Sequence, residues 1–200
     1  MKIKTTRKYE MGVRAKAAET TSDEIIRVVG QLWMKYSIHE ITLQMVAQNT
    51  GVTVMTILRK FGSKEGLFDA AIRADTAGIQ DVRKESQAGN INHAILMLMK
   101  EYEYAGPAVI RTLAVENDLP VAAKILKKGR ELHKEWCKRI FGQYLPPSND
   151  KEYKIMLGAF YAATDVYKWK LLRNDLGYSE EETEKIFIKT VRGIIKIKNV

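Results

Sequence analysis

The chain has 200 residues, of which 46% are hydrophobic, enough to build the core of one domain or of a small module fused to a larger one. This composition excludes intrinsic disorder over the whole chain. The sequence has no run of about 18 apolar residues, and residues 1–20 are basic and polar, so we expect no membrane span, no secretory signal and a cytoplasmic location.

Basic side chains outnumber acidic ones by 33 to 24, which gives a formal net charge of +9. They are dense over residues 1–18, which hold Lys2, Lys4, Arg7, Lys8, Arg14 and Lys16. Lysines and arginines that neutralise phosphates release condensed counterions, so a flexible basic arm over residues 1–18 suits binding to a polyanion. A solvated tail without a partner would have the same composition, and the sequence leaves both interpretations open.

Helical periodicity begins shortly after this arm. Apolar residues recur at helical spacing from Ile25 to Tyr36, and a capping box between Thr21 and Glu24 predicts that the first helix begins at Thr21. After a short break, Thr42 can cap a second helix that runs through residue 49.

A sharp turn and two further helices follow. Gly51 permits the turn, because a residue without Cβ readily adopts positive φ. Thr53 can cap a third helix, from Val54 to about Phe61, and Ser63 opens a fourth helix over residues 64–87. Two short helices joined through Gly51 have the dimensions of a helix-turn-helix.

Longer helices are predicted for the rest of the chain. Their limits are set by apolar stripes and by breaks at glycine and proline. They cover residues 91–104, a short segment from 107 to 115, residues 120–145, residues 151–176 and residues 179–198. All recognisable elements are helical, so we expect an all-α protein.

From Ile25 to Ile72 the sequence resembles the TetR-type family of helix-turn-helix transcriptional regulators. The residues that carry the resemblance are Thr42, Val46, Ala47, Gly51, Val52, Thr53, Thr56, Ile57, Phe61, Ser63, Lys64, Glu65, Gly66 and Leu67. Residues 73–200 match the family only in the number and length of their helices. The resemblance implies a basic arm over residues 1–18, a three-helix DNA-binding head over 19–66, and a helical effector-binding and dimerisation bundle over 67–200.

The resemblance also implies which residues meet DNA. It places Val54, Met55 and Thr56 near base edges, with Gln44 as a further candidate, and Thr42, Thr53, Lys60 and Lys64 at positions that hold phosphates. Physical chemistry agrees, because hydroxyls and lysines bind phosphate oxygens and glutamine pairs with adenine. Leu58 departs from the pattern, since many relatives have an aromatic hydroxyl there. The apolar side chains of Val54, Met55 and Leu58 indicate either contact with thymine methyl groups or weaker DNA binding.

Aromatic and methionine side chains at helical spacing in the second half indicate a packed bundle that could also line a pocket for a small apolar or amphipathic effector. The residues we select for this pocket are Leu98, Tyr102, Trp136, Ile140, Phe160 and Thr164. The sequence does not identify the effector. Asp165 could meet a cationic ligand, although a hydrogen-bonded or surface carboxylate is the simpler interpretation.

The sequence predicts no enzyme, no cofactor and no metal site. Cys137 is the only cysteine, which excludes disulfides within the chain and zinc or iron–sulfur sites built from several cysteines. His133 and Cys137 are four residues apart on one predicted helix, but two ligands are too few for a metal. The sequence has neither a glycine-rich phosphate loop nor a paired acid–base motif.

We therefore expect a DNA-binding regulator, a repressor that a small effector releases from a palindromic operator on double-stranded DNA. We also expect a homodimer through the last two helices, over 151–176 and 179–198, because their apolar residues exceed one buried stripe. The alternative is a helical small-molecule-binding protein or enzyme with a degenerate helix-turn-helix and no operator. Activation instead of repression is also compatible with the sequence.

Overall fold

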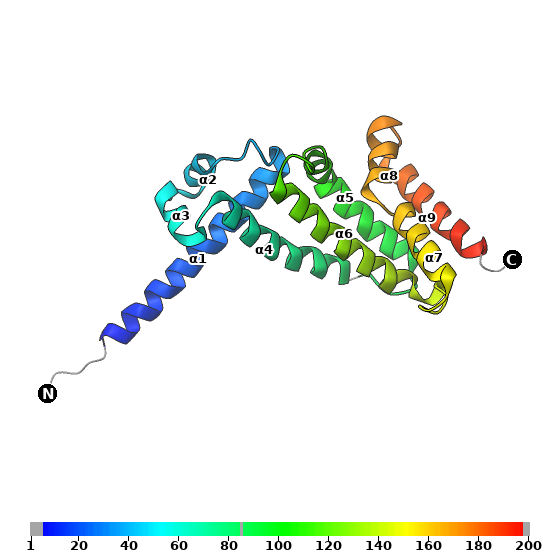
Figure 1. The fold of residues 1–200 in the computed structure, drawn as a ribbon, viewed down its shortest axis with the longest axis horizontal. Coiled ribbons are helices and arrows are strands. Elements are labelled where there is room, and N and C mark those ends of the chain that lie inside the picture. Colours follow the sequence, from blue (N-terminus) through cyan, green and yellow to red (C-terminus); the bar gives the residue numbers. More distant parts are fainter. Residues whose placement is uncertain (1–5, 85, 198–200) are drawn as a thin grey trace. The chain divides into compact units, whose positions relative to one another are not determined.

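The computed structural model describes the backbone of residues 6–84 and 86–197, and the side chains of 21–74 and 86–196 (Figure 1). These residues form helices joined by short turns, with no strand among them, so the expected all-α class is confirmed. The chain divides into two compact units between Asp75 and Thr76, within α4. The helices are α1 Thr6–Lys35, α2 Leu43–Thr50, α3 Val54–Phe61, α4 Lys64–Lys84, α5 Ile91–Leu113, α6 Pro120–Phe141, α7 Lys151–Ala163, α8 Val166–Lys170 and α9 Glu180–Ile197.

The core of the N-terminal unit is built by one face of α1 together with the short helices. Its buried side chains are Ile25, Val28, Val29, Leu32, Ile38, Ile41, Val46, Ile57, Leu67 and Phe68. The spacing of the α1 residues matches the helical stripe expected from the sequence. Because α2 and α3 each add one fully buried aliphatic residue, Val46 and Ile57, to this core, both helices are fixed by packing as well as by their caps.

Helix α1 begins at Thr6 and not at Thr21. The predicted capping box is therefore wrong: Thr21 and Glu24 lie inside the helix, and Glu24 accepts a hydrogen bond of 2.8 Å from Nε of Arg27. Residues 6–18, expected as a flexible arm, continue the helix, while residues 1–5 lie outside the described part. The three alanines and one lysine of residues 15–18 have high helix propensity, so no residue type there ends the helix.

Helix α5 runs without a break through Gly106 and Pro107, where the sequence analysis placed a helix end. Proline lacks the N–H that would bond to the carbonyl of Glu103. The buried face of α5 continues on both sides of this position, through Ala108 and Thr112, so the packing outweighs one missing hydrogen bond. A Cβ on Gly106 would lie 2.6 Å from the ring of Trp169, so glycine allows that indole to pack against the helix.

The helix expected over residues 151–176 is broken. Helix α7 ends at Ala163, α8 begins at Val166, and a π-helical turn follows over Leu171–Asp175. The break is stabilised locally, because Thr164 Oγ1 donates to the carbonyl of Phe160 at 2.7 Å and Asp165 Oδ1 accepts from the Tyr167 N–H at 2.9 Å. Threonine and aspartate compete in this way with the helical backbone and favour caps.

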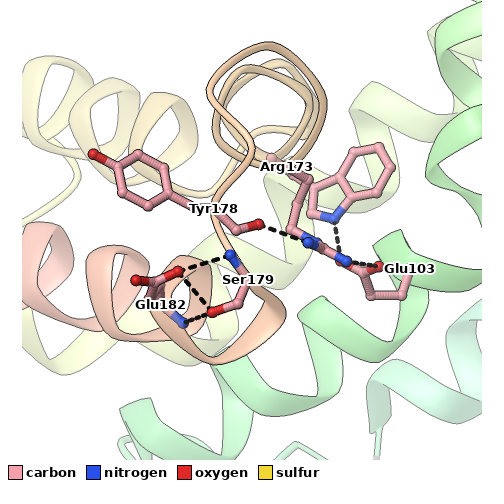
Figure 2. A network of polar contacts seen from close by, with 6 residues as sticks. Glu103, Arg173, Tyr178, Ser179 and Glu182 are labelled. Carbon is pink, nitrogen blue, oxygen red and sulfur yellow. Dashed lines mark hydrogen bonds and ion pairs between the residues drawn. The ribbon is translucent and has the colours of Figure 1, made fainter.

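One carboxylate ties the π-helical turn to α5 (Figure 2). Glu103 accepts hydrogen bonds from Trp169 Nε1 at 2.8 Å and from Arg173 Nε at 2.6 Å. The Arg173 guanidinium and the indole N–H hold the pKa of Glu103 below its usual value. Arg173 Nη1 also donates to the carbonyl of Tyr178, and Ser179 and Glu182 then form the capping box of α9. The start of α9 expected near residue 179 is thus confirmed.

Helices α5 to α9 enclose a core of aromatic and aliphatic side chains. Phe141 stacks on Phe160 with ring centroids 4.4 Å apart, and Trp136 meets Phe141 edge-on at 5.6 Å. Phe187 and Val191 of α9 are fully buried in the same cluster. Within the described residues, no helix is long and apolar enough to cross a membrane.

Candidate nucleic-acid interface

Helix α2 and the turn after it form as the sequence predicts. Thr42 caps α2, because its Oγ1 accepts a hydrogen bond of 3.1 Å from the Met45 N–H. Gly51 ends the helix with φ of 69°, in the left-handed region that glycine adopts without strain. The buried side chain of Val46 orients α2, so that Gln44 on another side is exposed.

Helix α3 is capped and anchored in the same manner. Thr53 Oγ1 accepts from the Thr56 N–H at 3.1 Å and lies 3.0 Å from Thr56 Oγ1, so both hydroxyls are used at the helix start. Ile57 is completely buried, whereas Met55 is 73% exposed. Val54 and Leu58 are half-buried. Packing of Ile57 therefore turns the side of α3 that carries Met55 toward solvent.

The connection from α3 to α4 is held by backbone geometry. Gly62 has φ of 79° and its N–H donates to the carbonyl of Leu58 at 2.8 Å. Ser63 Oγ then accepts from the Gly66 N–H at 3.0 Å and opens α4. A Cβ on Gly66 would collide with the carbonyl oxygen of Phe61, so only glycine allows the first turn of α4 to lie this close to the end of α3.

All nine residues predicted to contact DNA lie in the N-terminal unit, but their side chains differ in exposure. Exposed are Thr42, Gln44, Thr53 and Met55; half-buried are Val54, Thr56, Leu58, Lys60 and Lys64. Lys60 Nζ donates to Ser22 Oγ of α1 at 2.9 Å, so this ammonium lies against the domain's own first helix. Lys64 lies on the first turn of α4, with Nζ 5.9 Å from the centre of the Phe68 ring.

One exposed basic residue on α3 was not predicted as a DNA contact from the sequence. Arg59 is exposed and follows Met55 by four residues, so the two side chains share one face of the helix. A guanidinium on this face can donate either to phosphate oxygens or to guanine, both of which arginine binds in a bidentate manner. The four-residue spacing from Met55 was the signal that could have identified it.

The six residues selected for an effector pocket all lie in the C-terminal unit and are buried. Five of them belong to the core cluster, and Thr164 adjoins it, because Tyr102 Oη donates to the Thr164 carbonyl at 2.8 Å. Trp136 packs beside Phe141, which stacks on Phe160. The side chains are therefore brought together, in contact with core neighbours.

His133 and Cys137 face the same threonine. His133 Nε2 lies 3.1 Å and Cys137 Sγ 3.6 Å from Thr164 Oγ1, so both side chains contact the buried threonine at the break after α7. No group of three or more metal-binding side chains occurs in the part of the chain whose side chains are described. Asp165 caps α8, and burial raises the pKa of its carboxyl group above its usual value.

Comparison with known proteins agrees with this geometry. Residues 25–71 match the model of the bacterial regulatory proteins of the tetR family. No curated protein was found to match the chain.

Solved structures share the fold. A transcriptional regulator from Rhodococcus sp. RHA1 superposes with a TM-score of 0.64 at 14% identity, covering 90% of this chain and 96% of its own. A protein assigned to the TetR-family transcriptional regulators, from Mesorhizobium loti MAFF303099, gives a TM-score of 0.63 at 10% identity, with 90% and 97% covered. A protein assigned as a transcriptional regulator, from Pseudomonas aeruginosa PAO1, gives 0.64 at 12% identity, with 89% and 91% covered. At these identities the likeness establishes the fold.

Proposed function

We propose that this chain is a transcriptional regulator that reads a palindromic operator as a homodimer, and the match of residues 25–71 to the model of the bacterial regulatory proteins of the tetR family supports this proposal. The observation that carries the proposal is the pair α2 and α3. Both helices are capped by threonine and joined at Gly51, and α3 exposes Met55 and Arg59 on one face. In a helix-turn-helix the second helix lies in the major groove, where such side chains reach base edges.

Phosphate contacts would hold α3 in this position. Thr42 and Thr53 use their oxygens as acceptors for the caps, and a hydroxyl that accepts can still donate its hydrogen to a phosphate. Lys64 adds a positive charge at the start of α4. Such contacts fix the register of the protein on the duplex but carry no sequence information, which must come from base contacts.

Dimerisation through α7 and α9 would place two copies of the helix-turn-helix of α2 and α3 on the two halves of a palindrome. Helix α7 exposes Ile155, which is 63% accessible, together with Gly158 and Ala162 on the same face. On α9, Ile194 and Ile195 are only half-buried within their own chain. A two-fold copy of the same helices is the commonest partner for such faces and would form a four-helix bundle.

We also propose that a small apolar or amphipathic effector binds within the C-terminal unit and releases a repressor from DNA. Supporting this are the buried aromatic cluster and the methionines that adjoin it, since methionine side chains repack easily. The selected side chains contact core neighbours, so entry of a ligand requires a repacked arrangement. Helix α4 begins in the N-terminal unit and continues past Asp75 into the C-terminal unit. It is therefore the covalent connection through which such a change would reach α3.

Selection from a random duplex library with the full chain tests the proposed function. We expect enrichment of inverted half-sites whose centres lie about one helical turn apart. Replacing Gln44 with Ala should change the preferred base, whereas Gln31→Ala, on an exposed site of α1, should leave the enriched sequence unchanged. A library that shows no enrichment above background would leave a helical binding protein without an operator as the better description.

Effector control has its own test. A ligand found by its effect on thermal unfolding should change operator affinity by at least about fivefold, the lower end of typical allosteric coupling. Ligands that bind the C-terminal unit and change operator affinity by less than about twofold would argue against release by an effector.

A further inference from the structure

We propose that Met55 is the principal base-reading side chain of this protein and that it selects a thymine through the C5-methyl group. This inference rests on the proposed function, because it assumes that α3 enters the major groove. It adds which base is read, by which residue and through which atom.

Met55 is 73% exposed, far more than any other apolar side chain described in the N-terminal unit. It lies on the first turn of α3, the part of a recognition helix that contacts base edges. Its α3 neighbour Ile57 is completely buried, so α3 does not need Met55 for its own packing.

The polar side chains beside Met55 form hydrogen bonds within the protein. The hydroxyls of Thr53 and Thr56 lie 3.0 Å apart and Thr53 also caps the helix, so hydrogen bonds within the protein use one of the two hydroxyl hydrogens and leave a single hydroxyl donor between the two residues. Lys60, on the next turn, donates to Ser22 of α1. The start of α3 is thus left with an apolar side chain as its most accessible reader.

The major groove offers an apolar partner for Met55. The edges of the four base pairs present hydrogen-bond donors and acceptors in the major groove, and the thymine methyl is the one apolar group among them. A thioether side chain makes at most weak hydrogen bonds, so the favourable partner for Met55 is that methyl. Arg59, four residues later on the same face, is exposed and can bind a neighbouring phosphate or guanine.

Removal of single methyl groups from the operator tests this inference. Each thymine of a selected half-site is replaced in turn by uracil, which lacks only the C5-methyl group. Burial of one methyl group corresponds to about fourfold in affinity. We therefore expect one position at which uracil weakens binding about fourfold, and about 15-fold when both half-sites are changed.

Variants of Met55 identify the reader. Met55→Gln has nearly the same length but is polar, and should be insensitive to uracil at that position, whereas Met55→Leu should keep the preference. Substitution at so exposed a residue should leave folding intact, which circular dichroism verifies. Gln31→Ala serves as the surface control.

Each other result has a distinct meaning. Specific operator binding without any uracil-sensitive position would overturn the inference and leave the proposed function standing. A uracil effect that persists in Met55→Gln would overturn it as well, since another side chain would then read the methyl. Absence of a selected operator would overturn both.

Discussion

Replacement of Gly66 by alanine should destabilise the N-terminal unit, because the new Cβ would meet the backbone oxygen of Phe61. That oxygen belongs to the end of α3 and cannot move without shifting the turn at Gly62. Overpacking against a rigid neighbour costs about 1–3 kcal/mol. Alanine also has the higher helix propensity, by about 1 kcal/mol, so the expected net loss of stability is up to about 2 kcal/mol.

Gly30→Ala is the matched control, because Gly30 lies in the interior of α1, in the same unit, and a Cβ there would meet no atom within 4 Å. It should stabilise the unit by up to about 1 kcal/mol. Thermal unfolding followed by circular dichroism compares the two variants, and about 1 kcal/mol corresponds to roughly 4–8 °C in a unit of this size. A Gly66→Ala melting temperature equal to or above that of Gly30→Ala would refute the close approach of α3 and α4.

Three further predictions concern charge, pH and assembly. Lys64→Ala should weaken binding to all DNA sequences and reduce the salt dependence by about one counterion, measured by fluorescence anisotropy at several salt concentrations; Lys134→Ala, at an exposed position of α6, should not. Burial lowers the pKa of Lys168 from 10.5 to about 8, so the folded state releases this proton before the unfolded state does. The unfolding free energy should therefore rise between pH 8 and 10.5 relative to Lys168→Met, by about 1 kcal/mol for a partly exposed group, and parallel urea-unfolding profiles of the two proteins would contradict the burial. In sedimentation, Ile155→Glu should shift a dimer toward the chain mass of 22.8 kDa, whereas Tyr104→Glu, at an exposed position of α5, should remain dimeric; a dimer that survives Ile155→Glu would place the interface elsewhere.

Helices α2 and α3 and the turn between them could be predicted from sequence because their signals are local. Thr42 and Thr53 cap α2 and α3 at the expected positions, and Gly51 has the left-handed conformation that its turn requires. Each of these features depends on a residue type that few others can replace. The need for glycine at position 66 depends instead on packing between two helices. A side chain there would collide with the carbonyl oxygen of Phe61 at the end of α3, and the fold brings the two residues together.

Tertiary contacts explain what the sequence did not reveal. Proline normally ends a helix, yet α5 continues through Pro107 because its buried face extends beyond this residue and Gly106 accommodates Trp169. The break at Thr164 has its local caps and also contacts partners distant in sequence, among them Tyr102 and His133. Lys60 stays a predicted phosphate contact, and its hydrogen bond to Ser22 of α1 is a contact that no periodicity of α3 could reveal.

The central claim is that α3 reads sequence, and its most direct test is the ratio of affinities for the selected operator and for a shuffled duplex of the same composition. Both affinities are measured with the full chain at one physiological salt concentration, since nonspecific binding depends strongly on salt. We expect the operator to bind about 10³-fold more tightly or better, the range of specific DNA-binding proteins. Equal affinities for the two duplexes would contradict the claim.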